Sequence, residues 1–123
     1  MYDIVLLILN YNNAKDTIEL CNSLINQKDI KFKILVVDNC SPDNSHETIK
    51  DKLKENSLVE IIKSTTNGGY AKGNNVGLRY IEKNLGTKYV AILNNDLIIS
   101  DEYLFSSLIK RYNNLNNPAF ITP

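Results

Sequence analysis

Long apolar runs alternate with amphipathic stretches along most of the chain. The longest runs, Ile4–Leu9, Phe32–Val37 and Tyr89–Leu93, contain almost no polar residues. Short runs of this kind are typical of strands that are buried on both faces of a parallel sheet, so we predict a strand at each of them. Val59–Ile62 is predicted as a further strand, and Leu97–Ile99 as a short fifth one.

Between these strands, apolar residues recur every three or four positions, which is the period of an amphipathic helix. This period predicts helices at about 14–27, 44–55, 76–86 and 102–112. The second helix is expected to begin at a capping box formed by Asn44 and Glu47, and to lie exposed because its apolar face is thin. Strands and helices in this order favour an α/β fold with a mostly parallel sheet and helices on both faces, in one domain over residues 1–123.

Composition excludes several classes of function. The chain has 123 residues, which suits one domain, and its 14 basic and 14 acidic residues leave no net charge to attract a nucleic acid. The apolar start Met1–Leu9 contains Asp3 and is too short to span a bilayer. Cys21 and Cys40 lack the spacing of a metal site and indicate a reducing compartment, and the single His46 cannot build a histidine metal site or a triad unaided.

Polar residues follow four of the predicted strands. In open parallel sheets, ligands bind outside the carboxyl ends of the strands, so these residues are candidates for one shared site. They are Asn10-Tyr11-Asn12, Asp38-Asn39, Asn67-Gly68-Gly69-Tyr70 and Asn94-Asn95-Asp96. None has the glycine-rich pattern of a dinucleotide or P-loop site, and Asn10 and Asn12 stand where a response regulator would need paired acids.

Two of these groups have a structural interpretation beside the functional one. Asp38 could cap a turn, or it could accept hydrogen bonds from a base or a ribose. The triplet Asn94-Asn95-Asp96 could be a turn, or it could supply oxygen ligands to Mg²⁺ or Mn²⁺ while a bound diphosphate supplies the others. Asp43 is predicted to be a turn or cap residue.

The segment after the third strand combines turn residues with helical glycines. Asn67-Gly68-Gly69 is strong turn sequence. Gly73 and Gly77 stand at the start of a helix, where each glycine costs about 1 kcal/mol against alanine. That cost predicts close approach to the backbone by a neighbouring strand or by a ligand. Lys72 either is solvated or contacts a phosphate.

The four polar strand ends, taken in order, resemble a known family. They occur in the stretches NYNN, VVDNCSPDNS, NGGYAKGNNVGL and AILNNDLIIS. In this order they resemble the amino-terminal, nucleotide-binding half of the family 2 glycosyltransferases, inverting enzymes of the GT-A fold, which is a Rossmann-like three-layer α/β/α fold. NGGYAKGNN followed by LNND is most similar to the rhamnosyltransferase-type members that build bacterial surface polysaccharides. The similarity covers about Ile4 to Ser100.

The resemblance implies a role for each matching position. The nucleotide-sugar site would comprise Asn10, Tyr11, Asn12, Asp38, Asn67, Gly69, Lys72, Gly73, Asn74, Asn94 and Asn95. The first three would border the nucleotide base, and Asp38 would bind the base or the ribose. The triplet ending at Asp96 falls where the family carries its Asp-x-Asp motif, so Asp96 would hold Mn²⁺ or Mg²⁺ on the diphosphate. Asn94 replaces the usual first aspartate, which weakens that metal ligand.

The implied activity is hexosyl transfer, with inversion, from a nucleotide-diphosphate sugar to an acceptor hydroxyl of a saccharide or a lipid-linked acceptor. In the family, a carboxylate base in the acceptor-binding half deprotonates the acceptor, and a metal neutralises the leaving diphosphate. The sequence stops within the strand-like AFITP. We therefore expect a truncated donor-binding domain without the acceptor half or the base, inactive alone. The full-length protein would be cytoplasmic, peripheral to the inner face of the membrane.

Two other functions are alternatives to a glycosyltransferase. A nucleotidyltransferase can share a related core, but it would need a basic, glycine-rich loop after its first strand, and NYNNAKD contains no glycine. A non-catalytic nucleotide-binding or assembly module stays open, because the acceptor half is expected to be absent.

Overall fold

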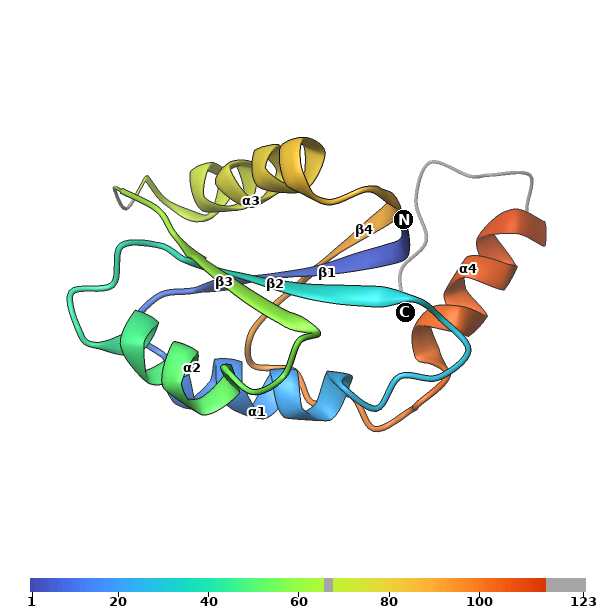
Figure 1. The fold of residues 1–123 in the computed structure, drawn as a ribbon, viewed down its shortest axis with the longest axis horizontal. Helices are drawn as coiled ribbons and strands as arrows, with labels where there is room; N and C mark the ends of the chain where they lie inside the picture. Colours follow the sequence, from blue (N-terminus) through green and yellow to red (C-terminus); the bar gives the residue numbers. More distant parts are fainter. Residues whose placement is uncertain (66–67, 115–123) are drawn as a thin grey trace.

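The computed structural model describes residues 1–65 and 68–114 of the chain. Within these residues, four strands alternate with four helices (Figure 1). The strands are β1 (Tyr2–Asn10), β2 (Phe32–Asp38), β3 (Val59–Lys63) and β4 (Thr87–Leu93), and the helices are α1 (Ala14–Leu24), α2 (Ser45–Leu53), α3 (Tyr70–Asn84) and α4 (Leu104–Asn114). All strand pairs are parallel, in the order β3-β2-β1-β4. None of the described helices is long and apolar enough to cross a membrane.

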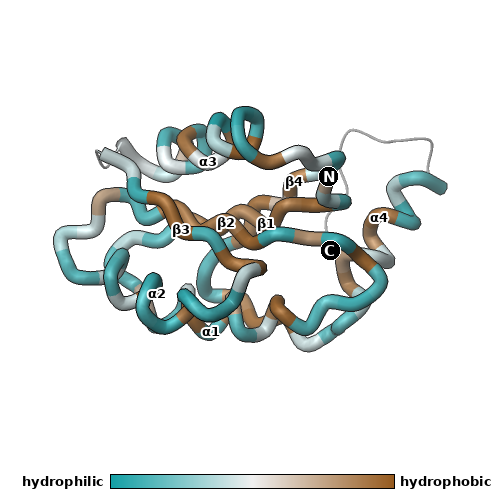
Figure 2. The backbone as a smooth tube through the Cα atoms, in the orientation of Figure 1, coloured by the Kyte–Doolittle hydropathy of each residue, from teal (hydrophilic) through white to brown (hydrophobic). Residues whose placement is uncertain are grey.

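Helices cover both faces of the sheet. α3 lies on one face, and α1 and α2 lie on the other (Figure 1). Successive residues of the central strands divide between two apolar layers: Leu6 and Val36 face the α1 side, whereas Leu7 and Val37 face the α3 side. Figure 2 shows these apolar strand segments between more polar helices. β1 and β2 are buried because each has a strand on both edges and helices on both faces.

α4 lies at the end of the sheet where the strands begin, away from their carboxyl ends (Figure 1). Phe105 of α4 is buried in the same apolar layer as α1. The side chain of Gln27, which follows α1, holds the start of α4, since its amide donates to the carbonyl of Asp101 (2.6 Å) and accepts from the N–H of Phe105 (3.3 Å). α4 therefore does not cover the carboxyl ends of the strands.

The predicted α/β class and parallel sheet are confirmed, but the fifth strand predicted at Leu97–Ile99 is wrong. The N–H of Leu97 bonds to the carbonyl of Asn94 in a turn (3.4 Å). The N–H of Ile99 bonds to the hydroxyl of Ser23 (3.2 Å). The segment therefore follows α1 and does not join the sheet. The strand predicted at AFITP lies outside the described residues.

Two helix starts also differ from prediction. α3 begins at Tyr70, inside the segment predicted as a loop, directly after Gly69 turns the chain with a φ of 90°. The capping box at the start of α2 does not form, because the side chain of Asn44 makes no capping hydrogen bond. Instead, the carboxylate of Asp43 accepts from the N–H of Ser45 (2.9 Å), which confirms Asp43 as a turn and cap residue.

Gly73 and Gly77 allow α3 to approach the sheet closely. A Cβ on Gly77 would lie 2.5 Å from Cδ1 of Leu7 and 3.0 Å from Cγ2 of Val37. A Cβ on Gly73 would lie 2.5 Å from Cδ1 of Leu9. Strand side chains therefore account for both glycines, as the first of the two predicted alternatives requires.

Candidate functional site

The carboxyl ends of β1 and β4 border a cleft of about 510 Å³. Its walls are formed by Leu9, Tyr11, Asn13, Asp16, Tyr70, Leu93, Asn94, Asn95 and Asp96. These residues belong to the end of β1, the start of α1, the start of α3 and the end of β4 with its following loop, which meet at one edge of the sheet (Figure 1). Small-molecule sites typically measure about 300–1,000 Å³. The edge predicted to hold the site is therefore hollowed to a suitable size.

Asp38 lies behind this cleft and not on its wall. It ends β2 beside Asn10, its register partner on β1, and both residues are fully buried. One carboxylate oxygen of Asp38 accepts from Nδ2 of Asn10 (3.0 Å) and from the Ser41 hydroxyl (2.6 Å). The other oxygen accepts from the N–H of Ser41 (3.2 Å). Because burying a carboxylate is costly without such donors, these bonds are what allow Asp38 to sit in the interior.

Thr17 connects this buried pair to the loop after β4. Thr17 belongs to α1 and is fully buried. Its hydroxyl donates to Oδ1 of Asn10 (2.7 Å) and accepts from Nδ2 of Asn95 (3.2 Å), which lies 78 residues away in sequence. A row of hydrogen bonds therefore joins the wall of the cleft to the carboxylate of Asp38.

The triplet after β4 forms the open wall of the cleft. Asn94 and Asp96 are exposed, and Asn95 is half-buried. The hydroxyl of Tyr70 donates to Oδ1 of Asn94 (3.3 Å), so the start of α3 reaches the triplet. The carbonyl of Asn94 also closes the turn described above. The turn and the site are therefore compatible, because the turn presents these side chains to the cleft.

Sequence reasoning does not identify the wall that α1 contributes. Oδ1 of Asn13 accepts from the N–H of Asp16 (3.3 Å), and Nδ2 of Asn13 donates to Oδ2 of Asp16 (2.9 Å). This reciprocal cap places a second carboxylate on the same cleft as Asp96. The sequence could have predicted this cap, since Asn-x-x-Asp before an amphipathic helix is a variant of the capping box. Tyr70 belongs to one of the four polar strand ends that the sequence predicts for a shared site, although the family resemblance assigns it no role.

Tyr11 and Asn12 form the turn between β1 and α1. Asn12 has a φ of 51°, a left-handed conformation that asparagine tolerates. The N–H of Asn12 donates to the Ser41 hydroxyl (3.0 Å), and Oδ1 of Asn12 accepts from the N–H of Asp43 (3.4 Å). This turn is thus tied to the loop after β2, and it leaves Tyr11 44% exposed on the wall of the cleft.

Of the predicted residues around the start of α3, Tyr70 lines the cleft, whereas Gly69, Lys72, Gly73 and Asn74 do not. The carbonyl of Gly69 accepts from Nδ2 of Asn39 (3.3 Å). Asn74 is buried, and its Oδ1 has no hydrogen-bond partner within the described part of the chain. Gly73 packs against Leu9.

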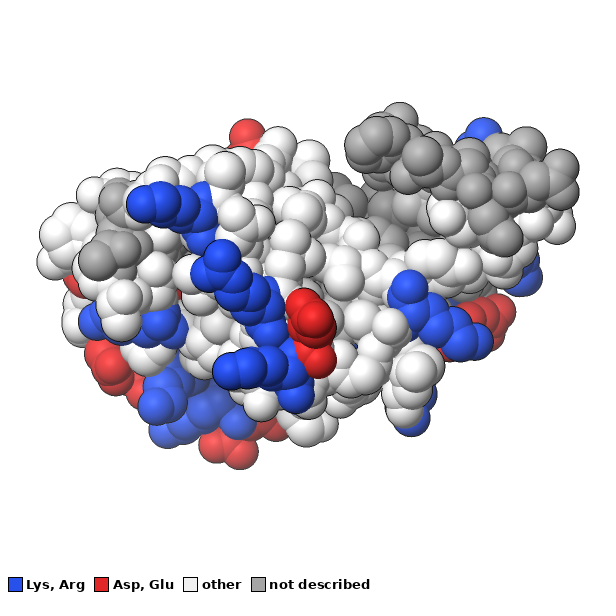
Figure 3. Space-filling view, turned by 90° about the horizontal axis from the view of Figure 1, so that it is seen from above, with Lys and Arg blue, Asp and Glu red and all other residues white. Residues whose placement is uncertain are grey.

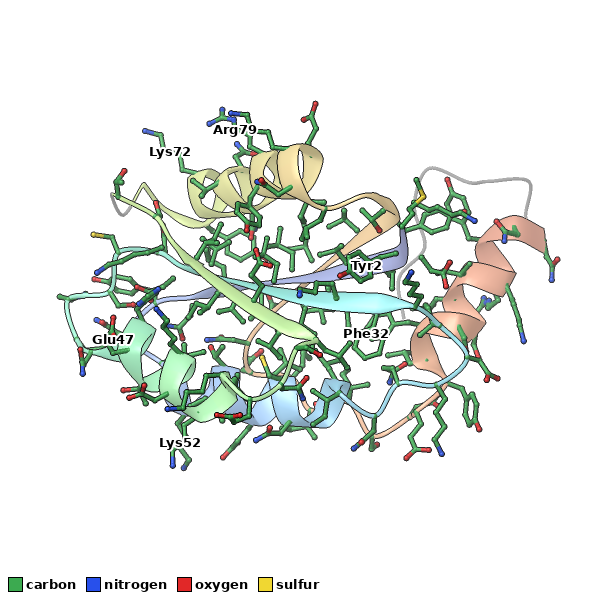
Figure 4. All side chains as sticks on the ribbon, viewed as in Figure 1. Tyr2, Phe32, Glu47, Lys52, Lys72 and Arg79 are labelled. Atoms are coloured by element: carbon green, nitrogen blue, oxygen red, sulfur yellow. The ribbon has the colours of Figure 1, made fainter. Side chains whose placement is uncertain are left out.

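Lys72 is exposed on the outer side of α3. It points away from the sheet, as Arg79 does (Figure 4). Seen from this side of the molecule, basic side chains form a row across the surface (Figure 3). Lys72 is therefore solvated in this structure. Asn67, the last of the predicted site residues, lies outside the described residues.

The donor atoms around the cleft suit a metal that is bound together with a ligand. In residues 1–65 and 68–114, no three His, Cys, Asp or Glu side chains form a metal-binding group. The cleft offers the carboxylates of Asp16 and Asp96 and the amide oxygens of the triplet. Mg²⁺ is usually bound through one or two carboxylates, with water and substrate phosphates in the other positions. The residues therefore fit a hard divalent ion shared with a diphosphate, and not an all-protein metal site.

Comparison with known sequences identifies relatives over most of the chain. Residues 5–121 match the family model described as Glycosyl transferase family 2. The poly(ribitol-phosphate) beta-N-acetylglucosaminyltransferase TarS of Staphylococcus aureus (strain Mu50) is 31% identical to the chain over 100 residues. The alignment covers 80% of this chain and 17% of TarS. The chain is 24% identical over 94 residues to the glycosyltransferase GlyG of Streptococcus pneumoniae serotype 4, which covers 76% of this chain and 30% of GlyG. The chain thus spans less than a third of the length of these relatives.

Solved structures agree with this assignment. S. aureus TarS in complex with UDP matches with a TM-score of 0.74 and 26% identity, over 91% of this chain and 32% of that one. The mannosyltransferase PcManGT from Pyrobaculum calidifontis, in complex with GDP-Man and Mn²⁺, shares the fold with a TM-score of 0.77 at 19% identity, over 90% of this chain and 32% of that one. Both are GT-A glycosyltransferases, which confirms the expected fold. Together with a family model that matches nearly its whole length, these likenesses show that the chain belongs to glycosyl transferase family 2.

Proposed function

We propose that the chain is the donor-binding portion of an inverting glycosyltransferase and that it binds a nucleoside diphosphate sugar in the cleft. One observation carries the proposal: carboxylate, amide and aromatic side chains from several segments converge on a cleft of about 510 Å³ at the carboxyl edge of the sheet. Family membership and the UDP and GDP-Man complexes of the structural relatives support it.

The base and ribose are assigned to the region between Tyr11 and Asp38. Tyr11 is exposed on the wall of the cleft, and its ring provides a face on which a base can stack. Asp38 accepts three hydrogen bonds from residues in the described part of the chain. A carboxylate has about four acceptor positions, so one remains for a base N–H or a ribose hydroxyl that reaches this strand end. Asn10 bonds to Asp38, and Asn12 bonds to the loop after β2, so both residues fix the position of this strand end.

The diphosphate is assigned to the triplet after β4. Without a cation, the carboxylates of Asp16 and Asp96 would repel a diphosphate, so we expect a divalent metal to strengthen binding. Asp96 would hold Mg²⁺ or Mn²⁺ with Asn94, and phosphate oxygens would complete the coordination. Bound there, the ion would supply charge neutralisation to the departing diphosphate.

In this proposal the residues of the chain bind and orient the donor. Deprotonation of the acceptor hydroxyl is assigned to a carboxylate in the acceptor-binding half of a longer protein, as the family resemblance implies. We therefore expect the 123-residue chain to bind the nucleotide without transferring sugar. For the longer protein, we propose hexosyl transfer to a saccharide or lipid-linked acceptor in surface polysaccharide synthesis, at the cytoplasmic face of the membrane.

Calorimetric titration of the chain with UDP, dTDP and GDP, each with EDTA or with Mn²⁺, tests this function. We expect one nucleotide to bind, more tightly with Mn²⁺. Asp96→Ala should remove the metal enhancement, whereas Asp51→Ala, at an exposed carboxylate of α2, should leave it unchanged. The absence of heat with every nucleotide would contradict the proposal and favour a non-catalytic assembly module.

A further inference from the structure

The row of hydrogen bonds through Thr17 joins two parts of the proposed site. At one end, Asp38 and Asn10 are fully buried. At the other end, Asn95 lines the cleft within the triplet that is assigned to the diphosphate. Thr17 stands between them, fully buried and absent from the wall of the cleft, so its side chain reaches the site only through these partners.

Asp38 fixes the direction of every bond in the row. A carboxylate accepts hydrogen bonds and donates none, so the amide of Asn10 must turn its NH₂ toward Asp38 and its oxygen toward Thr17. That oxygen receives the single hydrogen of the Thr17 hydroxyl (2.7 Å). Thr17 can then only accept from Asn95, and Nδ2 of Asn95 lies 3.2 Å from its hydroxyl oxygen.

The orientation of the Asn95 amide follows from this chain of donors. Because the amide is planar, directing Nδ2 toward Thr17 places its oxygen on the arm that is turned away from Thr17. An asparagine without such a partner can exchange the positions of its oxygen and nitrogen by rotation. The network removes that freedom in a residue that lies between Asn94 and Asp96.

We propose that Thr17 is a positioning residue that couples the base end of the site to its diphosphate end. This inference rests on the proposed function, since a nucleoside diphosphate is the ligand that would span both ends. With Thr17 in place, Asp38 and Asn95 are held in one mutual orientation before the ligand arrives, so the ligand does not have to order them. Loss of the hydroxyl releases both ends together.

The test compares Thr17→Val, which keeps the shape and removes the hydroxyl, with Thr17→Ser, which keeps the hydroxyl. Thr48→Val is the matched control, because Thr48 is exposed on α2 and its hydroxyl bonds to the carbonyl of Asn44 (2.9 Å). UDP is titrated into each 123-residue chain, with EDTA and with Mn²⁺, and dTDP or GDP takes its place if that is the nucleotide which the unmodified chain binds. We expect Thr17→Val to weaken UDP binding about tenfold in EDTA and to reduce the Mn²⁺ enhancement, with Thr17→Ser within about twofold of the unmodified chain. Thr48→Val should change neither value.

A double-mutant cycle separates positioning from a general structural role. Asn95→Ala breaks the row at its half-buried end, so Thr17→Val should weaken UDP binding less in that background than in the unmodified chain. Additive losses overturn the inference, as does a Thr17→Val chain that binds UDP and responds to Mn²⁺ like the unmodified one. A failure of the unmodified chain to bind any nucleotide overturns the proposed function, and this inference with it.

One further measurement needs no variant and applies even if Thr17→Val does not fold. In NMR spectra of the unmodified chain, the hydroxyl proton of Thr17 should exchange slowly and show a cross-peak to the side-chain NH₂ of Asn95. A hydroxyl proton that exchanges rapidly with water would contradict the buried bond on which the coupling depends.

Discussion

Two strand ends of this sheet carry an aspartate in opposite surroundings. At the end of β2, Asp38 is fully buried and accepts three hydrogen bonds from Asn10 and Ser41. After β4, Asp96 is exposed on the wall of a cleft. The two carboxylates look alike in sequence, but Asp38 is held inside the protein by hydrogen bonds and Asp96 lies open to the cleft. Asp38 should therefore contribute to stability as well as to binding, whereas Asp96 should contribute to metal and ligand binding with little effect on stability.

The largest expected effect is the difference in stability between Asp38→Ala and Asp96→Ala. Removing the carboxylate of Asp38 leaves the buried donors of Asn10 and Ser41 unpaired, which we expect to cost about 3 kcal/mol of unfolding free energy. Asp96→Ala removes an exposed group and should change it by less than about 0.5 kcal/mol. Urea unfolding of both variants measures the difference. An equal loss of unfolding free energy in the two variants would contradict the different structural roles of Asp38 and Asp96.

The packing of α3 on the sheet should also contribute to stability. Gly77→Ala places a methyl group 2.5 Å from Leu7 and 3.0 Å from Val37. Overpacking typically costs about 1–3 kcal/mol, and the better helix propensity of alanine returns about 1 kcal/mol, so we expect a net loss of about 1 kcal/mol. Gly86→Ala is the control, because its nearest contact would be an ordinary 3.7 Å from Met1. Thermal unfolding that ranks Gly86→Ala as the more damaging change would refute this view of α3.

Asn94→Asp tests metal binding at the exposed triplet after β4. It adds a carboxylate to the triplet without disturbing the buried end, so the Mn²⁺ enhancement of UDP binding should rise about fivefold. Asn22→Asp, at an exposed position of α1, is the matched control for the added charge. Calorimetry with and without Mn²⁺ measures both. An enhancement that stays the same would argue against Asn94 as part of a metal site.

The smallest effect concerns the two cysteines, which contrast the core with the loop after β2. Burial raises the pKa of the Cys21 thiol to about 12, so the folded chain keeps this thiol protonated and unreactive through neutral and mildly alkaline pH. Cys40 is partly exposed. Iodoacetamide at about pH 8 should therefore modify only Cys40 until the chain is unfolded, as mass spectrometry can show. Equal labelling of both in the folded chain would mean that the core opens readily.

Much of the fold could be predicted from the pattern of apolar residues. Buried parallel strands need apolar side chains on both faces, and that requirement made β1 and β2 visible as long runs with almost no polar residues. The same reasoning failed at 97–99. Leu97 and Ile98 have strand-like side chains, but they are 39% and 62% exposed, and the backbone there bonds to a turn and to α1. Apolar composition alone does not supply a neighbouring strand.

The site was accessible only in part. The triplet after β4 could be located because parallel strands bring their carboxyl ends to one edge. The contribution of Thr17 could not, since its hydroxyl contacts Asn95 across 78 residues and the local sequence shows only a helical threonine. That Asp38 would lie inside the protein also depended on Ser41, whose N–H and hydroxyl both reach it. Such contacts depend on how the loops close.

We propose that the cleft at the carboxyl ends of the strands binds a nucleoside diphosphate. The most direct test is to record amide NMR spectra of the isotopically labelled chain while UDP and Mg²⁺ are added. We expect shifts at Tyr11, Asp16, Tyr70 and the triplet Asn94-Asn95-Asp96, which line the cleft. Spectra that do not change, or that change only around the second cleft of about 280 Å³ between α2 and β3, would contradict it.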